Sequence, residues 1–180
     1  NWVKIVYSPG REGYIFKTYA SPVWLKILKK ERTLYLMSSE TVLKTYPIAL
    51  GFDPENDKTR QGDGCTPEGR FYLCEMLKNP KPASKYGARS MRISYPNPED
   101  ARQGLVKKQI SRKEYLDIIE KINQGIIPPQ TTSLGGSIRI HGGGVNTDWT
   151  LGCIAMKDAD IVDLYASLPP KNTCVEIYKS

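Results

Sequence analysis

The sequence predicts a mainly β fold, a β-sandwich-like or α+β domain with two or three short helices. Short strand-like runs separated by turn residues predict it, together with only two segments of clear helical spacing. A chain of 180 residues fits one domain of ordinary size, or one domain and a fragment of another. Hydrophobic residues make up 39% of the chain, and no stretch approaches the ~20 apolar residues of a membrane span.

Residues 1–25 are expected to form an N-terminal appendage, and residues 26–180 the main domain. Within the appendage, strand-like runs at residues 2–5 and 13–15 flank a turn at Pro9-Gly10. These residues resemble the last strands of a bacterial SH3-like module, which implies that the earlier strands of that module are missing from this sequence. The alternative is a strand pair that simply pads the main domain.

The main domain is expected to consist of strands joined by polar turns. Residues 34–37 and 42–46 flank Ser38-Ser39-Glu40 and predict a hairpin. The polar segment 52–69 predicts a long loop, and loops of that length in compact domains are often functional. Further strands are expected at residues 71–76, 138–140 and 174–178.

Two helices are expected in the main domain. The first follows Ser111, which forms a capping box with Glu114, and it ends at Gly125. The second begins near Asp158, which can cap it, and it ends before Pro169. Each has one apolar face, so we expect both helices to pack on the core rather than to bind a ligand.

The formal net charge of +7 raises the question of an anionic partner. The basic residues form short, scattered pairs such as Lys29-Lys30 and Lys107-Lys108, and no nucleic-acid-binding motif is present. We therefore expect no nucleic acid partner, whereas an anionic polymer such as a bacterial wall suits the mild basicity. The chain opens without the basic start and apolar run of a secretion signal, so its location cannot be read from targeting.

The four cysteines, Cys65, Cys74, Cys153 and Cys174, contain no C-x-x-C pair, and the chain has one histidine. This combination argues against a tetrahedral zinc site. If Cys153 is a nucleophile it must stay reduced, so at most one disulfide can form among the other three. Burial of these three as thiols is the alternative.

The single histidine, His141, precedes three glycines and stands twelve positions before Cys153. A thiol attacks carbonyls well as thiolate, and a nearby imidazole is the usual group that takes its proton. Glycines beside both residues allow tight turns and leave backbone N–H groups open to bind an oxyanion. The alternative is a turn histidine and a buried cysteine, both without catalytic roles.

Three separated segments extend this pattern. They are residues 62–71 with Thr66-Pro67-Glu68-Gly69, residues 93–97 with Asp100 after them, and residues 138–156 with His141 and Cys153. In this order they resemble the L,D-transpeptidase (YkuD-type) catalytic domain family of bacterial wall enzymes. The resemblance covers roughly residues 33–178, and it implies a β-sandwich-like fold and no metal or organic cofactor.

The resemblance assigns roles to residues at matching positions. Cys153 matches the nucleophile, which attacks the carbonyl of the third residue of a tetrapeptide stem, releases D-Ala and forms a thioester. His141 matches the base, and Gly152 precedes the nucleophile, so its N–H and that of Cys153 are expected to bind the oxyanion. Gly142 lies beside the base, where close backbone approach matters.

Two positions depart from the family pattern. The family commonly has histidine where this chain has Leu151, and often has arginine where it has Ala155. His141 must therefore act without a second histidine, and the role of the arginine is either missing in this chain or supplied by another residue. Arg139, Arg89 and Arg92 are candidates; Arg139 is the preferred one, because residues two apart on a strand share a face and Arg139 then faces the same side as His141.

Two aromatic residues complete the expected site, and several alternatives remain open. Trp149 lies between His141 and Cys153 and is expected to wall the substrate groove, the alternative being a loop anchor that packs on the core. Tyr95 is expected as a further substrate contact. Asp148 could orient His141, although the family usually uses a backbone carbonyl. An L,D-carboxypeptidase shares the acylation half of the reaction, and an idle wall-binding module is a second alternative. A papain-like peptidase is disfavoured because there the cysteine comes first in the chain. Peptidoglycan stem peptides as partners imply a periplasmic or extracytoplasmic location.

Overall fold

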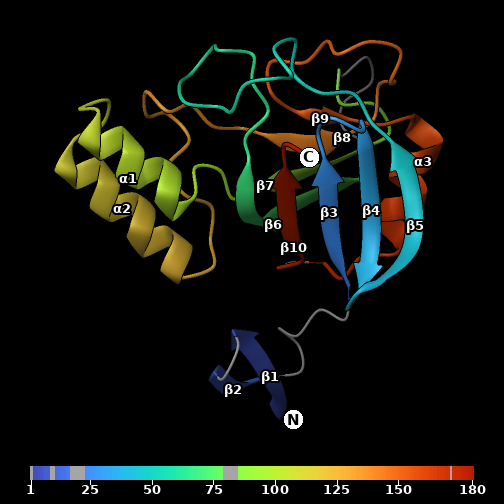
Figure 1. Ribbon diagram of the computed structural model, residues 1–180, viewed down its shortest axis with the longest axis horizontal. Helices are drawn as coiled ribbons and strands as arrows, with labels where there is room; N and C mark the ends of the chain where they lie inside the picture. The colour runs from blue at the N-terminus through green and yellow to red at the C-terminus, as the bar shows by residue number, and fades with distance from the viewer. Residues whose placement is uncertain (1, 9–10, 17–22, 79–84, 171) are drawn as a thin grey trace.

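The computed structural model describes residues 2–8, 11–16, 23–78, 85–170 and 172–180 (Figure 1). Strands β1 (Trp2–Ser8) and β2 (Arg11–Phe16) pair antiparallel in a two-stranded sheet of their own. The two expected strands of the appendage are therefore confirmed, while the turn at Pro9-Gly10 lies outside the described residues. The SH3-like assignment stays a prediction, because a hairpin alone does not identify that module.

The remaining eight strands form one sheet in the order β5-β4-β3-β10-β6-β7-β8-β9. All five strands expected in the main domain are present, and β3, β7 and β9 were not foreseen. Because β3 begins at Trp24, the eight-stranded sheet includes the last two residues of the expected appendage, 1–25. The strands are β3 (Trp24–Leu28), β4 (Thr33–Ser38), β5 (Thr41–Pro47), β6 (Gly69–Lys78), β7 (Arg89–Ile93), β8 (Arg139–His141), β9 (Ile154–Ala155) and β10 (Cys174–Tyr178).

The sheet curls until its two ends meet. After edge strand β5, the chain crosses to the opposite edge, where Ala49 and Ala155 exchange two backbone hydrogen bonds of 2.8 and 2.9 Å. A further bridge joins Gly51 to Thr150. This closure brings the start of the long loop, residues 52–68, against the segment that leads into β9.

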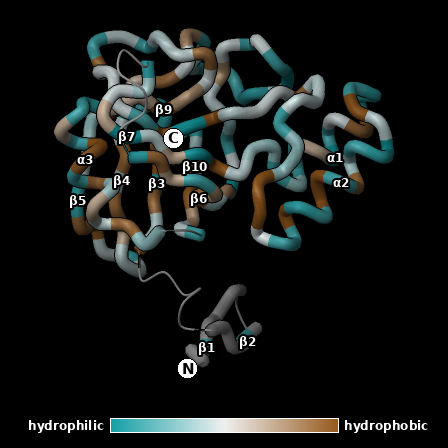
Figure 2. The backbone as a smooth tube through the Cα atoms, turned by 180° about the vertical axis from the view of Figure 1, so that it is seen from behind, coloured by the Kyte–Doolittle hydropathy of each residue, from teal (hydrophilic) through white to brown (hydrophobic). Residues whose placement is uncertain are grey.

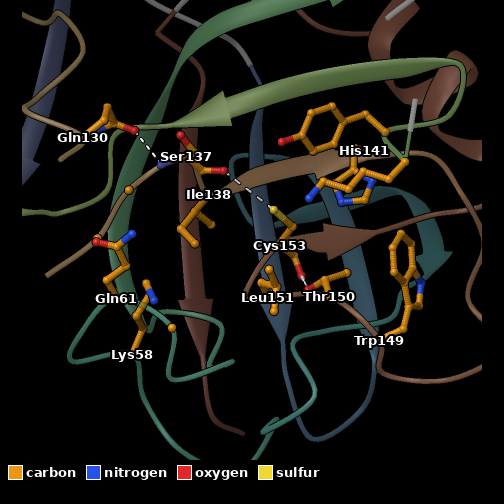
Figure 3. A pocket seen from close by; sticks show the side chains of 15 residues that line it. Lys58, Gln61, Gln130, Ser137, Ile138, His141, Trp149, Thr150, Leu151 and Cys153 are labelled. Carbon is orange, nitrogen blue, oxygen red and sulfur yellow. Dashed lines mark hydrogen bonds between the residues drawn. The ribbon is translucent and has the colours of Figure 1, made fainter. Parts of the chain in front are cut away.

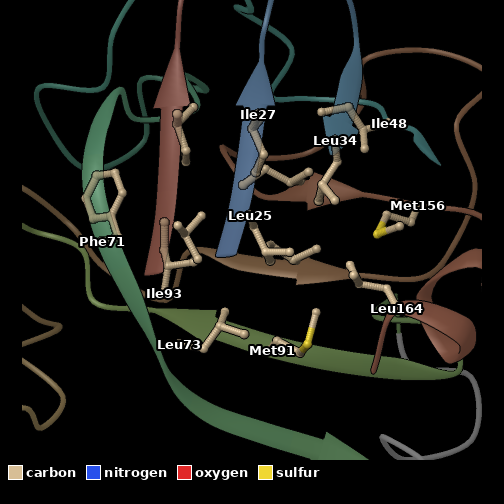
Figure 4. Packing of buried hydrophobic residues seen from close by; sticks show 14 of the residues in the cluster. Leu25, Ile27, Leu34, Ile48, Phe71, Leu73, Met91, Ile93, Met156 and Leu164 are labelled. Atoms are coloured by element: carbon tan, nitrogen blue, oxygen red, sulfur yellow. The ribbon is translucent and has the colours of Figure 1, made fainter. Parts of the chain in front are cut away.

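Alternating burial along the strands places one hydrophobic cluster inside the curled sheet (Figures 2 and 4). In β3, Leu25 and Ile27 are fully buried while their neighbours are partly exposed, which is the period-two pattern of a half-buried strand. Helix α3 covers the cluster with Ile161 and Leu164. The enclosed core confirms the mainly β, sandwich-like expectation.

The structure contains three helices among the described residues: α1 (Pro98–Val106), α2 (Arg112–Asn123) and α3 (Asp158–Ala166). The capping box of Ser111 and Glu114 is confirmed at the start of α2. Helix α1 was missed, although Asn97 and Asp100 form a second capping box with proline at the first helical position. None of these helices is long and apolar enough to cross a membrane.

The expectation that Asp158 caps α3 is wrong. The N-cap residue is Lys157, which makes no side-chain capping bond, and Asp158 is the first helical residue. Its carboxylate instead accepts hydrogen bonds from the backbone N–H groups of Ala88 (2.9 Å) and Gly143 (3.2 Å). Asp158 therefore ties α3 to the two loops beside His141.

Lys29 fixes the long loop to the end of β3. Its side chain is buried, and its ammonium group donates to Asn56 O (2.7 Å), Thr66 O (3.0 Å) and Glu68 Oε1 (2.9 Å). Three acceptors from one loop satisfy the three donors of the ammonium group. All four cysteines are free thiols, so no disulfide contributes to holding this loop.

Candidate functional site

A cavity of about 450 Å³ contains both His141 and Cys153 (Figure 3). Its walls come from the long loop, from the segment before β7, from the segment before β8 and from the loop between β8 and β9. The lining residues that carry functional groups in the argument below are Lys58, Lys85, Tyr86, Ser137, Trp149 and Thr150. The two residues that the motif predicted are thus brought into one site.

The parallel pairing of β8 and β9 explains why the two side chains meet. His141 is the register partner of Ala155, and Cys153 stands two residues before Ala155. Residues two apart in an extended chain face the same side, so Cys153 and His141 project from the same face of neighbouring chain segments. Figure 3 shows the thiol and the imidazole beside each other at the cavity.

His141 is held in a defined orientation. Its Nδ1 lies 2.5 Å from the carbonyl oxygen of Gly142, and because a carbonyl only accepts, Nδ1 carries the proton. The ring also packs edge-on against Tyr86 and Trp149, at centroid distances of 5.1 and 5.7 Å. Nε2 is therefore the nitrogen that can accept a proton.

The imidazole of His141 is neutral near pH 7. Burial lowers the pKa of His141 to about 4, and the charges of Arg139 and Lys85 act in the same direction, against the Gly142 hydrogen bond and Asp158. The expected alternative orienter, Asp148, does not serve this role. Its carboxylate pairs with Arg32 and accepts the N–H of Leu50.

Cys153 is also neutral at rest. Burial raises the pKa of its thiol, while a backbone hydrogen bond from Arg139 and the charges of Arg139, Lys85 and Lys58 lower it. The thiol donates to the carbonyl oxygen of Ser137 at 3.7 Å. Thiol and imidazole are thus both uncharged in the resting site.

Gln130, which sequence reasoning missed, positions that Ser137 carbonyl. The side-chain oxygen of Gln130 accepts the N–H of Ser137 (2.6 Å), and its amide nitrogen donates to Tyr95 O and Pro128 O. Ser137 needs this support because its φ of 57° lies in the left-handed region. A glutamine in a Pro-rich loop carries no sequence signal for such a role.

Gly152 is required by close packing. Its φ is 119°, and a Cβ there would lie 2.5 Å from the carbonyl oxygen of Cys65. Its N–H donates to the hydroxyl of Thr150 (3.1 Å), and that hydroxyl donates to Cys153 O (2.7 Å). In this conformation the Gly152 N–H is therefore committed to Thr150, which corrects the expectation that it is open for an oxyanion.

Gly142 is also a packing position rather than a lining residue. A Cβ there would lie 2.0 Å from Asp158 Oδ1. Its N–H bonds Tyr86 O (3.0 Å) and Arg89 O (3.2 Å). Gly142 contributes to the site through its carbonyl, which orients His141.

Two expected substrate contacts do not line the cavity. Arg139 is buried and is ion-paired with Glu75, and it donates to Ser90 Oγ at 3.0 Å, so its guanidinium is already occupied. Tyr95 is fully buried in the core, where its hydroxyl donates to Leu134 O. Strand alternation, which predicted Arg139, says nothing of its pairing with Glu75. The motif that contains Tyr95 likewise says nothing of its burial.

Trp149 lies where it was expected. It lines the cavity, and its Nε1 donates to Gly144 O at 3.2 Å. The other two arginine candidates are absent from the cavity lining: Arg92 pairs with Glu75, and Arg89 stacks on Tyr165. Among the described residues, no cluster of three or more His, Cys, Asp or Glu side chains could hold a metal ion.

Comparison with known proteins agrees with this architecture. YafK of Escherichia coli K12, whose name assigns it provisionally to the L,D-transpeptidases, is 34% identical over 107 residues, which are 57% of this chain and 42% of YafK. Pgp2, the helical cell shape determining protein of Campylobacter jejuni, shares the fold with a TM-score of 0.61 at 20% identity, covering 89% of this chain and 48% of its own. An L,D-transpeptidase from Mycobacterium smegmatis does so with a TM-score of 0.51 at 10% identity, over 94% and 63% of the two chains.

The chain thus spans less than half the length of YafK and of Pgp2. The two structural likenesses show the fold alone. The model of the L,D-transpeptidase catalytic domain (YkuD) matches residues 22–177, most of the chain. On this match, and on a fold that brings the two motif residues into one cavity, the chain belongs to the L,D-transpeptidase catalytic domain family.

Proposed function

We propose that this domain is a cysteine-dependent L,D-transpeptidase that forms peptidoglycan cross-links from tetrapeptide stems. The single observation that carries the proposal is the cavity in which Cys153 and the oriented, neutral His141 stand together. The family acts on peptidoglycan stem peptides, which supports the choice of substrate. Such a substrate requires a location outside the cytoplasmic membrane.

Acylation uses both residues. The Cys153 thiol proton passes to Nε2 of His141 as Sγ forms a bond to the carbonyl carbon of the third stem residue. The tetrahedral intermediate collapses with cleavage of the C–N bond to D-Ala, and the imidazolium returns its proton to the departing amine. The products are a thioester on Cys153 and free D-Ala.

The second half restores the thiol. An acceptor amine loses a proton to His141 and attacks the thioester carbon, so that an amide bond forms and the C–S bond breaks. The imidazolium returns the proton to the departing sulfur. Water in place of the amine gives a tripeptide, which is the L,D-carboxypeptidase outcome. The same residues perform both reactions, so the outcome depends on whether an amine or water reaches the thioester.

The idle wall-binding alternative makes a different prediction for Cys153. Slow alkylation does not distinguish it, because burial raises the pKa of this thiol in either case. Intact-protein mass spectrometry after mixing with a purified disaccharide-tetrapeptide does. We expect a mass increase equal to the disaccharide-tripeptidyl group, absent from Cys153→Ala; an unmodified wild-type protein with intact disaccharide-tetrapeptide supports the idle module and contradicts the proposal.

A further inference from the structure

The cavity around Cys153 is cationic. Its lining contains two lysines, Lys58 and Lys85, and no aspartate or glutamate. Every donor stem carries a free terminal carboxylate one residue beyond the attacked carbonyl, within about 3.5 Å of chain length. The position where the family often has arginine is Ala155 here, and the three arginines considered in its place are absent from the cavity lining.

Lys58 is not available to a substrate. It is buried, and its ammonium group forms an ion pair with Asp63 at 2.8 Å and donates to Arg60 O at 2.8 Å. The charge of Lys58 is therefore balanced inside the long loop. If the ammonium group moved to a substrate, the Asp63 carboxylate would lose its cationic partner. Lys58 forms part of the wall.

Lys85 has the opposite character. It is exposed, and no carboxylate among the described residues pairs with it. The residues outside the described ranges include no aspartate or glutamate in the sequence either. Its ammonium lies 5.9 Å from the Tyr86 ring centroid, and that ring packs against His141.

The backbone of Lys85 is fixed against the catalytic loop. A Cβ on Gly143 would lie 3.1 Å from Lys85 O, and the next carbonyl, that of Tyr86, accepts the N–H of Gly142. The charge of Lys85 is also close enough to influence both reacting groups, since it lowers the pKa of His141 and of Cys153. The ammonium group of Lys85 thus has no carboxylate partner in the described part of the chain, and its backbone packs against the loop that follows His141, at the cavity that contains Cys153.

We propose that Lys85 binds the free terminal carboxylate of the donor peptide, the carboxylate of the departing residue, and so selects stems that end one residue after the attacked carbonyl. This inference rests on the proposed function and deepens it. A lysine ammonium offers three donors on a flexible stem, and it gains most when it meets an unpaired carboxylate at the edge of a low-dielectric cavity.

Four synthetic donors test the proposal. Tetrapeptides with L-lysine or meso-diaminopimelate at the third position are each made with a terminal D-alanine acid or D-alaninamide. The rate of Cys153 acylation is measured for the wild type, for Lys85→Gln and Lys85→Arg, and for Lys113→Gln, an exposed lysine on α2 outside the cavity. Dissociation constants are measured in a Cys153→Ala background.

We expect the wild type to acylate with the acids about tenfold faster than with the amides, as for loss of one charge-assisted hydrogen bond. Lys85→Gln should bring the acid-to-amide ratio close to one, Lys85→Arg should keep most of it, and Lys113→Gln should leave it unchanged. The same ratios are expected in the dissociation constants.

Three outcomes overturn the inference. An equal loss with acids and amides in Lys85→Gln shows that Lys85 acts on the reacting groups and not on the terminal carboxylate. A preference that follows the diaminopimelate side chain instead assigns the cation to that carboxylate. An unchanged ratio in Lys85→Gln removes Lys85 from recognition. A wild type that acylates with none of the four donors contradicts the proposed function itself.

Discussion

At the scale of single residues, the site is controlled by how each reactive side chain is held. His141 and Cys153 are oriented by main-chain carbonyls, those of Gly142 and Ser137. Both carbonyls belong to turns with left-handed backbone nearby, at Gly143 and at Ser137 itself. Backbone geometry, rather than a third acidic side chain, therefore aligns the imidazole and the thiol.

The pH dependence of acylation follows from the environment of His141. Burial lowers its pKa to about 4 from an ordinary value of 6.5, so the neutral, proton-accepting form persists as pH falls and is lost only near pH 4. We expect kcat/KM for acylation to stay level from pH 7 down to about pH 5 and to decline below it. Stopped-flow or quenched mass measurements check this, and an acid limb centred between pH 6 and 7 would contradict it.

A second prediction at this scale concerns the hydroxyl group of Thr150. Its hydroxyl bonds both Gly152 N–H and Cys153 O, so valine of similar shape leaves a buried N–H without an acceptor. Thr150→Val should lower the free energy of unfolding by about 1–3 kcal/mol and slow acylation, whereas Thr150→Ser should retain most of both. Urea unfolding and acylation rates test this. Wild-type stability and rates in the valine variant would show that the two hydrogen bonds of the Thr150 hydroxyl do not support the site.

At the scale of elements, α1 and α2 form a small unit beside the curled sheet (Figure 1). They share a hydrophobic cluster of their own, formed by Ala101, Ile110, Ile118 and Leu134. Neither helix lines the cavity that contains Cys153. Because the pair is held by a small core and by its caps, its stability depends strongly on the capping residues.

Asp100 in α1 gives that stability a pH dependence. Burial raises its pKa to about 7 from 3.8; the Asn97 N–H and Lys58 oppose the shift, and Asp57 and Glu99 add to it. The folded state therefore holds a proton that the unfolded state releases between pH 4 and 7, so this group destabilises the fold as pH rises through that window.

Asp100→Asn should remove the effect, because the amide stays neutral and its oxygen can still accept the Asn97 N–H. We expect the variant and the wild type to differ little at pH 4. The free energy of unfolding of the variant should exceed that of the wild type by a margin that grows up to pH 7, by at most about 1.4 kcal/mol per pH unit, because only the wild type is destabilised. Urea unfolding of both proteins across this range measures the difference. A gap independent of pH would show that Asp100 is ionised throughout.

At the scale of the whole molecule, the sequence predicts the frame and the reactive pair better than the surroundings. Strand alternation and the Ser111 capping box identified most elements, because these signals are local. Helix α1 was overlooked although Asn97-Pro98 and Asp100 carry the same kind of signal. Strand β9 has two residues, too few for any periodicity.

The partners of each site residue depend on pairing between distant segments. Arg139 lies on the same strand face as His141, yet its guanidinium is ion-paired with Glu75 on β6, two strands away in the sheet. Lys85 belongs to no recognisable sequence motif. It lines the cavity because the segment before β7 packs on Gly143. Such outcomes are set by the closure of the sheet, which no local pattern in the sequence encodes.

The central claim is that Cys153 carries an acyl group from a tetrapeptide stem to an acceptor. The most direct test is mass spectrometry of the products formed from a purified disaccharide-tetrapeptide by the wild type and by Cys153→Ala. The account predicts a cross-linked dimer and free D-Ala in the wild type and neither in the variant. Tripeptide and D-Ala without dimer would make the domain a carboxypeptidase, and products that persist in Cys153→Ala, or no products from the wild type, would contradict the account.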